Sequence, residues 1–181
     1  MPEPKLRITN HRGGAAAGVG HLPRVRDQQI NDAIRRARSA KRKRAICNYH
    51  RPFERLQRML NAGMRDTYVA PHVHDHPRKL EVFVILRGCI AVASFDPDGN
   101  LADCAVLSDK GPVRAAEIPA GTWHSFVVLT RSAVVYELVD GRYDPRTHKH
   151  FAGWAPDERD TQGASAFVKK LRRQISLAAE K

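Results

Sequence analysis

Four histidines and one glutamate are the residues of this 181-residue chain whose types and spacing favour metal binding. His72, His74 and His76 alternate along a short segment, Glu81 follows them, and His124 ends a Pro-x-Gly-x-x-His sequence. Successive side chains of a β-strand point to opposite faces, so alternating histidines project to the same side. A carboxylate that opens an apolar strand is costly to bury unless it pairs with a cation. The pattern therefore predicts that imidazoles and a carboxylate converge on one ion.

Each of these pieces has an ordinary explanation when it stands alone. Alternating histidines also occur on solvated strand faces, and Pro-x-Gly is often only a turn. Their joint occurrence, with Glu81 between them, favours the metal site. Imidazoles and a carboxylate leave coordination positions open for water or substrate, which is typical of catalytic or ligand-binding centres. Fe, Mn, Ni, Cu and Zn all suit these donors, so we expect one divalent transition metal ion of undetermined identity.

The segment that carries these residues shows the period of two that is typical of β-strands. Short apolar runs, bounded by Gly, Pro, Asp or Ser, lie at residues 82–86, 90–95, 105–106, 126–129 and 133–139. The sequence DPDGN at 96–100 predicts a hairpin turn, because Pro presets φ and Gly accepts a positive φ. The spacing predicts an antiparallel barrel or sandwich. The run 82–86 is apolar on both faces, so a helix or a second subunit must cover one of them.

The basic residues of the chain lie toward its two ends. Lys and Arg total 31 against 19 Asp and Glu, a formal net charge of +12, yet residues 59–168 carry a charge of −3. Residues 24–58 carry +9, and apolar side chains at 30, 33, 34 and 37 predict a basic amphipathic helix there. Apolar side chains at 171, 175 and 178 predict a short C-terminal helix. Any nucleic-acid binding would therefore depend on the ends.

Length and composition predict one soluble domain that needs no disulfide to fold. We expect a disordered tail at 1–23, a basic helical segment at 24–58, a barrel with a C-terminal extension at 59–160, and a linker with a helix at 161–181. Cys47, Cys89 and Cys104 are widely spaced and form no C-x-x-C pair, which excludes a thiolate zinc site. No apolar run reaches membrane-spanning length, and residues 15–20 are too short for a secretory signal, so we expect a cytoplasmic protein without membrane partners.

Two segments resemble the two motifs of the cupin superfamily. The spacing Glu81-x6-Gly88 matches the end of the first motif, and Pro119-x-Gly121-x2-His124 matches the second. The start of the first motif is ambiguous, because two overlapping His-x-His pairs precede the glutamate. The resemblance implies a mainly β fold: a single cupin (a double-stranded β-helix or jelly-roll-like barrel). The apolar spacing at the two ends adds a basic N-terminal helix and a short C-terminal helix to this fold.

A longer stretch, over about residues 44–160, is similar to the WbuC family of cupin-fold metalloproteins. The matching sequences are NYH at 48–50, QRMLNA at 57–62, YVAPHVH at 68–74, KLE at 79–81, and KHFAGWAPDE at 149–158. That family's first motif resembles P-H-x-H followed by a longer gap to K-x-E. The resemblance therefore implies that the metal ligands are His72, His74, Glu81 and His124, with His76 in reserve. Asp66, Val128 and His148 depart from the expected residues, which affects the shape of the pocket mouth.

The resemblance implies a metal-dependent enzyme, or an enzyme-like protein, that acts on a small polar metabolite. It associates the chain with surface-polysaccharide (O-antigen) biosynthesis and so with a sugar or nucleotide-sugar, but it implies no reaction. Tyr143, Lys149 and Trp154 match the family's C-terminal signature and are candidate substrate contacts, although Trp154 is also suited to sealing the barrel end. Phe83 and Phe126 share parity with the ligands and are expected in the lumen.

A different class of function remains open from the sequence. A non-catalytic binding or regulatory module would use the basic N-terminal helix to engage nucleic acid or a partner. The helix has no interleaved aromatic residues, so a solvated or subunit-facing helix is the simpler interpretation. Cupin barrels often pair through an edge strand, and the two-faced apolar strands predict a homodimer.

Overall fold

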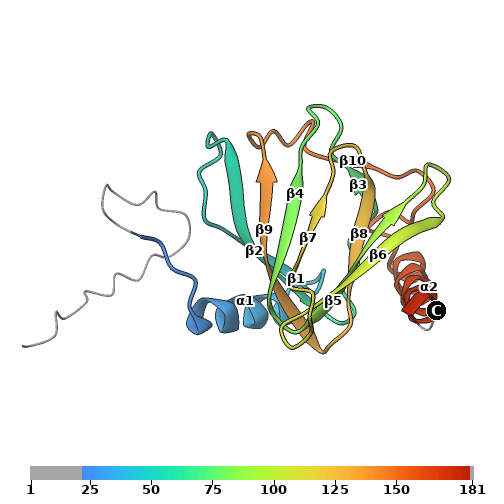
Figure 1. Ribbon diagram of the computed structural model, residues 1–181, viewed down its shortest axis with the longest axis horizontal. Helices are drawn as coiled ribbons and strands as arrows, with labels where there is room; N and C mark the ends of the chain where they lie inside the picture. The colour runs from blue at the N-terminus through green and yellow to red at the C-terminus, as the bar shows by residue number, and fades with distance from the viewer. Residues whose placement is uncertain (1–21, 180–181) are drawn as a thin grey trace, which may run out of the picture.

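The computed structural model describes residues 22–179, so the tail expected at 1–23 lies almost entirely outside the described residues. Two five-stranded antiparallel sheets face each other, with one helix before and one after them in the chain (Figure 1). The first sheet has the order β1 (Arg44–Asn48), β2 (Leu56–Met64), β9 (Ser132–Asp140), β4 (Glu81–Arg87) and β7 (Ala115–Ile118). The second has the order β10 (His150–Phe151), β3 (His72–Val73), β8 (Trp123–Val128), β5 (Cys89–Phe95) and β6 (Leu101–Ser108).

The facing sides of the two sheets enclose an apolar core. Inward side chains alternate with outward ones along each strand, as the period of two requires. The core includes Phe83 and Ile85 from β4, Ile90 from β5 and Phe126 from β8. Its side chains are at most 6% exposed, so the core excludes water from the space between the sheets. The two-sheet antiparallel architecture expected from the sequence is confirmed.

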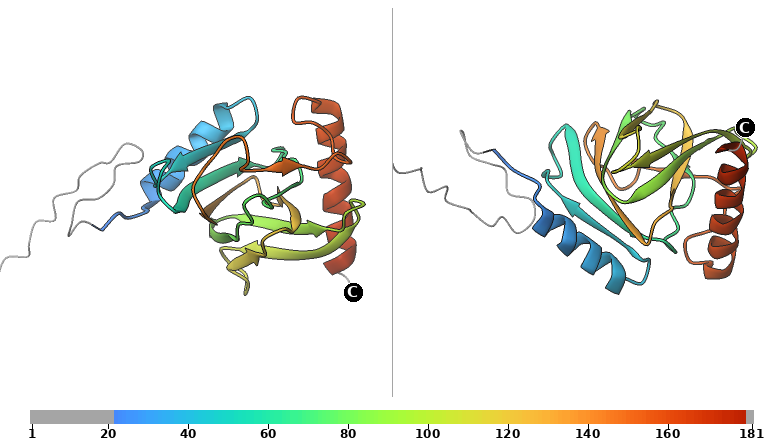
Figure 2. Two further views of the ribbon diagram at one scale, coloured as in Figure 1. Left: turned by 90° about the horizontal axis from the view of Figure 1, so that it is seen from above. Right: turned by 60° about the horizontal axis from the view of Figure 1, so that its bottom comes forward.

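Helix α1 (Asp27–Ser39) covers the outer face of the first sheet. Ile30, Ala33 and Ala37 recur at helical spacing and bury against outward side chains of β2 and β9, including Leu60 and Val134. The Gln29 side chain caps the helix by accepting from the backbone N–H of Arg26. The basic helix therefore covers the outward side chains of β2 and β9, but of the two-faced apolar run 82–86 it covers only Leu86. Figure 2 shows α1 on the opposite side of the barrel from the second helix.

Helix α2 (Thr161–Ala179) covers the outer face of the second sheet. Val168, Leu171 and Ile175 pack against the outward side chains of β5 and β8. The helix begins well before the residues that carry the apolar spacing, because Asp160 acts as its N-cap and accepts from the N–H of Gly163 at 2.9 Å. Neither helix in the described residues is long and apolar enough to span a membrane.

Some strands were not identified from the sequence. The expected strands match β4, β5, β6, β8 and β9 to within a few residues. The short strands β3, β7 and β10 carry too few residues to show a period. The segment 24–58, expected to be helical, is helical only over Asp27–Ser39 and also contains β1 and the start of β2. These strands form because their partners supply the hydrogen bonds, which is a tertiary effect that local sequence does not encode.

Candidate metal centre

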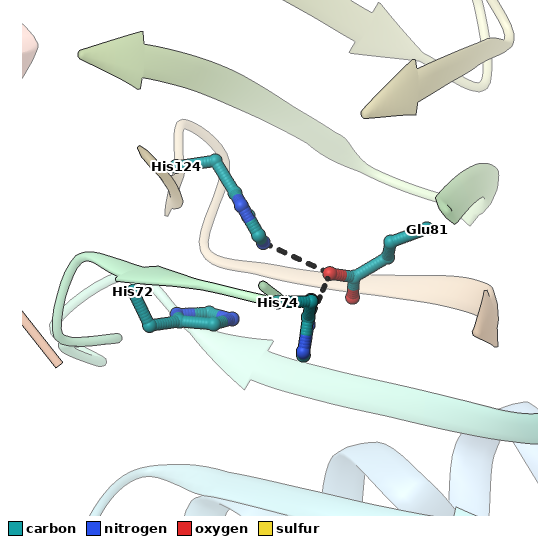
Figure 3. A group of neighbouring side chains, drawn as sticks. All are labelled: His72, His74, Glu81 and His124. Carbon is teal, nitrogen blue, oxygen red and sulfur yellow. Dashed lines mark hydrogen bonds and ion pairs between the residues drawn. The ribbon is translucent and has the colours of Figure 1, made fainter. Parts of the chain in front are cut away.

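The two sheets bring the predicted residues together from separate parts of the chain. His72 in β3 lies directly opposite His124 in β8 in the antiparallel register. His74 follows β3, and Glu81 opens β4 in the facing sheet. All four side chains are buried, with 2% exposure or less. The group therefore bridges the two sheets at one point in the interior (Figure 3), and we call these four residues the His–Glu cluster.

The turn before β8 orients two members of the cluster at once. Gly121 has a φ of +86°, a conformation that favours glycine, and its N–H donates to the carbonyl of His74 at 3.2 Å. The next N–H, of Thr122, donates back to Pro119 at 3.1 Å. The Pro-x-Gly turn therefore holds the backbone of His74 while it starts the strand that carries His124.

Each imidazole of the cluster donates its Nδ1–H to a backbone carbonyl. For His72 and His124 the acceptor lies two residues earlier in the chain, at 2.9 and 2.8 Å. For His74 the acceptor is the carbonyl of His148, far away in sequence. Because a carbonyl oxygen can only accept, each Nδ1 carries a proton, and the Nε2 atom of each ring is left to interact within the cluster. This is the tautomer found in metal-bound histidines.

Glu81 lies against two of these Nε2 atoms. Its Oε2 is 2.9 Å from Nε2 of His124 and 3.1 Å from Nε2 of His74 (Figure 3). Burial alone would raise the pKa of Glu81, but the contacts with His124 and His74 hold that pKa well below its usual value. The carboxylate is therefore charged. Lone pairs and a charged carboxylate repel one another unless a proton or a cation lies between them.

His72 favours the cation over the proton. Its Nε2 is a buried atom with no hydrogen-bond partner among residues 22–179. Burial, and then the nearby charge of Lys149, lower the pKa of His72 well below its usual value, so the ring stays neutral. A metal ion would give this lone pair a partner. Ligand atoms of the four residues lie within 4.8 Å of one another, and three imidazoles with one carboxylate suit a divalent transition metal.

A small cavity of about 20 Å³ adjoins the cluster. A space of this size holds little more than one water-sized group. The expected lumen residues Phe83 and Phe126 line it, together with two cations, Arg44 and Lys149. The full lining is Arg44, Ile46, Asn61, Val69, His72, Glu81, Phe83, His124, Phe126, Glu137 and Lys149.

Glu137 and Asn61 are cavity residues that sequence reasoning missed. Nδ2 of Asn61 donates to Oε2 of Glu137 at 2.8 Å. Burial, and then the negative charge of Glu81, raise the pKa of Glu137 to about 8. Glu137 and Val135 lie on the same buried face of the apolar run 133–139. A carboxylate on that face was a signal that the sequence already contained.

His76 does not share the site. The chain turns after Asp75, whose backbone forms an isolated antiparallel β-bridge with Arg78. The strand face expected from the alternating histidines therefore does not extend to His76. The His76 side chain is 79% exposed, and its Nδ1 lies 3.1 Å from Asp75. Asp75 also lies 2.7 Å from Nδ1 of His150, which makes a separate group at the surface. The structure thus places His72, rather than His76, beside His74.

The three candidate substrate contacts lie in different places. Lys149 lines the cavity beside the cluster. Tyr143 is 44% exposed and packs on His148, whose ring in turn contacts His74. Trp154 lies away from the cavity, in the apolar cluster under α2 and 5.2 Å from the ring of Phe95.

Three residues differ from those expected from the family resemblance, and the structure shows where each of them lies. Asp66 lies in an exposed turn after β2 and has no positive φ, so the glycine expected there is not needed. Val128 is fully buried in the core between the sheets. His148 supplies the carbonyl that holds His74, and burial, followed by the charge of Lys149, lowers its pKa to about 3. The change at His148 is therefore the one that touches the site.

One family model matches part of the chain. A family model described as a domain of unknown function, DUF6016, matches residues 25–107, from α1 into β6. No curated protein matches the chain.

Solved structures share the fold at low sequence identity. Two structures of the capsular polysaccharide assembling protein CapF from Staphylococcus aureus align with TM-scores of 0.53 and 0.51, each at 18% identity. They cover 62% and 59% of this chain but only 32% and 28% of CapF, so the chain spans about a third of the length of these relatives. The Cnp3 cupin domain of Schizosaccharomyces pombe aligns with a TM-score of 0.43 at 13% identity, over 56% of this chain and 66% of that one. The chain therefore shares the fold of part of CapF: a single antiparallel β-sandwich, here with a helix on each outer face.

Proposed function

We propose that the protein is a metal-dependent enzyme that binds one divalent transition metal ion through the His–Glu cluster and acts on a small polar metabolite. One observation carries the proposal. Three imidazoles have their Nδ1–H groups committed to carbonyls, so their Nε2 atoms are the ones left to bind an ion beside the buried carboxylate of Glu81, and the Nε2 of His72 has no other partner among the described residues. A divalent cation is the partner that satisfies His72, His74, His124 and Glu81 together.

The residues around the cluster have separate tasks in this proposal. The backbone carbonyls fix the ring orientations, and the aromatic rings of Phe83 and Phe126 exclude water from the lumen. A divalent ion bound at the cluster would supply Lewis-acid polarisation of a coordinated carbonyl or hydroxyl group. Lys149 lies where it can orient a negatively charged or polar group of the substrate. Tyr143 is a candidate contact only at the outer edge, and the packing of Trp154 supports a structural role.

Two resemblances support a metabolite linked to surface polysaccharides. The segment around residues 44–160 resembles the WbuC family, and the fold aligns with CapF, which is a capsular polysaccharide assembling protein. Both point to a sugar or nucleotide-sugar substrate. Within this proposal only one functional group of such a substrate enters the cavity, because the enclosed space is close to the size of a single water.

Elemental analysis of the purified protein tests the metal site. We expect about one metal ion per chain in the wild type and a loss of most of that metal in His74→Ala and His124→Ala. His76→Ala is the matched control, because it removes an exposed imidazole two residues from His74 and should keep the metal. Equal metal content in all four proteins, or a loss confined to His76→Ala, would contradict the proposed site.

The enzymatic part needs its own test. The metal-loaded protein is incubated with mixtures of sugars and nucleotide-sugars, and the products are followed by mass spectrometry. We expect a change in mass that disappears with a chelator, returns when the metal is restored, and is absent in His124→Ala. A wild type that holds its metal but converts none of these compounds would contradict a sugar substrate while leaving the metal site intact.

A further inference from the structure

Two cations line the same cavity as the His–Glu cluster. Arg44 reaches it from β1 and Lys149 from the residue before β10. The Arg44 side chain is only 12% exposed, and its nearest carboxylate, Glu158, lies 3.6 Å away and also pairs with Arg42. Within residues 22–179 no carboxylate lies at ion-pair distance from the Lys149 ammonium. The cavity therefore has positive groups whose charge its own residues satisfy only in part.

A bound divalent ion increases this excess of positive charge. Without the ion, the two positive charges of Arg44 and Lys149 face the negative charge of Glu81 and, only when Glu137 is ionised, a second negative charge. With the ion, two positive charges remain even when both carboxylates are ionised, and no further acidic side chain lines the cavity. Uncompensated charge in a buried space is costly, so the loaded site favours an anionic occupant.

A second observation points to a polar occupant. Asn61 is only 6% exposed, and its Oδ1 is a buried atom with no hydrogen-bond partner among the described residues, although its Nδ2 donates to Glu137. Buried polar atoms in proteins are nearly always hydrogen-bonded. This oxygen can only accept, so it calls for a donor such as a hydroxyl group of a ligand, which would lie beside the anionic group that the two cations favour.

We propose that the metal-loaded cavity binds a small organic acid, with the carboxylate of that acid between the metal and the side chains of Arg44 and Lys149. The inference rests on the proposed function, because it takes the divalent ion as bound at the cluster. A planar carboxylate matches the fork of a guanidinium, and one of its oxygens fits a space of about the size of a single water. Ile46 borders the cavity and is 44% exposed, so the rest of the acid extends outward past β1. Sugar acids belong to this class of ligand.

Calorimetric titration of the metal-loaded full chain with lactate and lactamide tests the inference. The two probes have nearly the same shape, but only lactate carries a negative charge. We expect lactate to bind at least ten times more tightly than lactamide. Arg44→Met and Lys149→Met should each weaken lactate binding at least ten-fold, while the metal content stays at about one ion per chain. Arg42→Met is the matched control, because Arg42 also pairs with Glu158 but does not line the cavity, and its lactate affinity should equal that of the wild type.

The outcomes separate this inference from the proposed function. Metal content is measured before each titration, so a wild type without metal overturns both. A loaded wild type that binds lactate and lactamide equally, or that binds inorganic phosphate more tightly than lactate, overturns the carboxylate inference alone. The same holds if neither Met variant weakens lactate binding. Methionine keeps an unbranched apolar stem, and thermal melting identifies a variant that fails to fold, in which case the other variant decides.

Discussion

The carbonyl oxygens that hold the three imidazoles come from different distances along the chain. His72 and His124 each use a carbonyl two residues earlier, so their orientation is fixed by their own strand entries. His74 depends on the carbonyl of His148, which precedes β10. The C-terminal extension of the barrel therefore participates directly in the geometry of the cluster. The carboxylate of the cluster, Glu81, comes from the opposite sheet.

Replacing Glu81 tests the one charged member of the cluster. We expect Glu81→Gln to weaken metal affinity by at least about 100-fold, because the amide keeps the size of the side chain but loses the charge that offsets the ion. Glu117→Gln is the matched control, since Glu117 is exposed on β7 beside β4 and lies opposite Val82. Competition with a chromophoric chelator measures both affinities. A Glu81→Gln protein that holds metal as tightly as Glu117→Gln would remove Glu81 from the site.

At this scale the sequence predicted the members of the cluster but not their surroundings. His72, His74, Glu81 and His124 could be identified because their spacing follows a known pattern along two short segments. The cavity cation Arg44 could not, because it lies on an edge strand hidden within a basic run, and only the pairing of β1 with β2 turns it inward. The sequence left open whether His72 or His76 lies beside His74. The chain turns after Asp75, and a turn produces no periodic pattern from which its direction could be predicted.

The two helices act as covers for the two sheets, and each buries a different apolar cluster. α1 was predictable in type and position, because its apolar residues keep helical spacing throughout. α2 was predicted too short, because the apolar spacing was followed only from Leu171, although buried Ala164 and Val168 extend it back toward the Asp160 cap. The short strands β3, β7 and β10 escaped prediction, since they are stabilised by neighbours rather than by their own residues.

Truncating a buried residue of α2 measures how firmly the helix is held. Leu171 is 1% exposed against the second sheet, so we expect Leu171→Ala to lower the free energy of unfolding by about 2–5 kcal/mol. Leu177→Ala makes the same change at a position that is 55% exposed on the same helix, and it should cost less than about 0.5 kcal/mol. Urea unfolding gives both values. Equal effects would mean that α2 is not docked as described.

The contact between Tyr68 and the segment leading into α2 gives a dependence on alkaline pH. Burial, and then the charge of Glu158, raise the pKa of Tyr68, whose hydroxyl donates to the carbonyl of Pro156 at 2.8 Å. The folded protein thus keeps this proton above pH ~10, where the unfolded chain loses it, so this group lowers stability as pH rises past that value. Tyr68→Phe should be less stable by about 0.5–1.5 kcal/mol at neutral pH, through the lost hydrogen bond.

The difference between wild type and Tyr68→Phe should therefore narrow as the pH rises above ~10, because the phenylalanine variant has no proton to lose. Urea unfolding at neutral pH and at pH ~10.5 measures the two differences. A gap that stays constant or widens would contradict the buried, hydrogen-bonded placement of Tyr68.

The His–Glu cluster joins the two sheets, so a bound metal ion should raise the stability of the whole folded protein. An ion that binds only the folded state at 100 times its dissociation constant adds about 2.7 kcal/mol. For a domain of this size that corresponds to a rise in thermal midpoint of about 5–10 °C. Scanning calorimetry with and without the metal should show this rise in the wild type and not in His74→Ala. A similar rise in both proteins would place the binding elsewhere.

Assembly remains a prediction at this scale. Of the apolar side chains on the outer face of β4, α1 reaches only Leu86, and the outward side chains of Val82 and Val84 stay half-buried, so the reason for expecting a homodimer still stands. Sedimentation velocity at micromolar concentration tests the expectation, and a single monomeric species would end it.

The central claim is that three imidazoles and one carboxylate from two facing sheets hold a single ion. A crystal structure of the metal-loaded protein, with diffraction recorded at the absorption edge of the metal, tests this claim most directly. We expect one strong anomalous peak within about 2.0–2.3 Å of Nε2 of His72, His74 and His124 and of a carboxylate oxygen of Glu81. A peak beside Asp75, His76 and His150 instead, or no peak at the cluster, would contradict it.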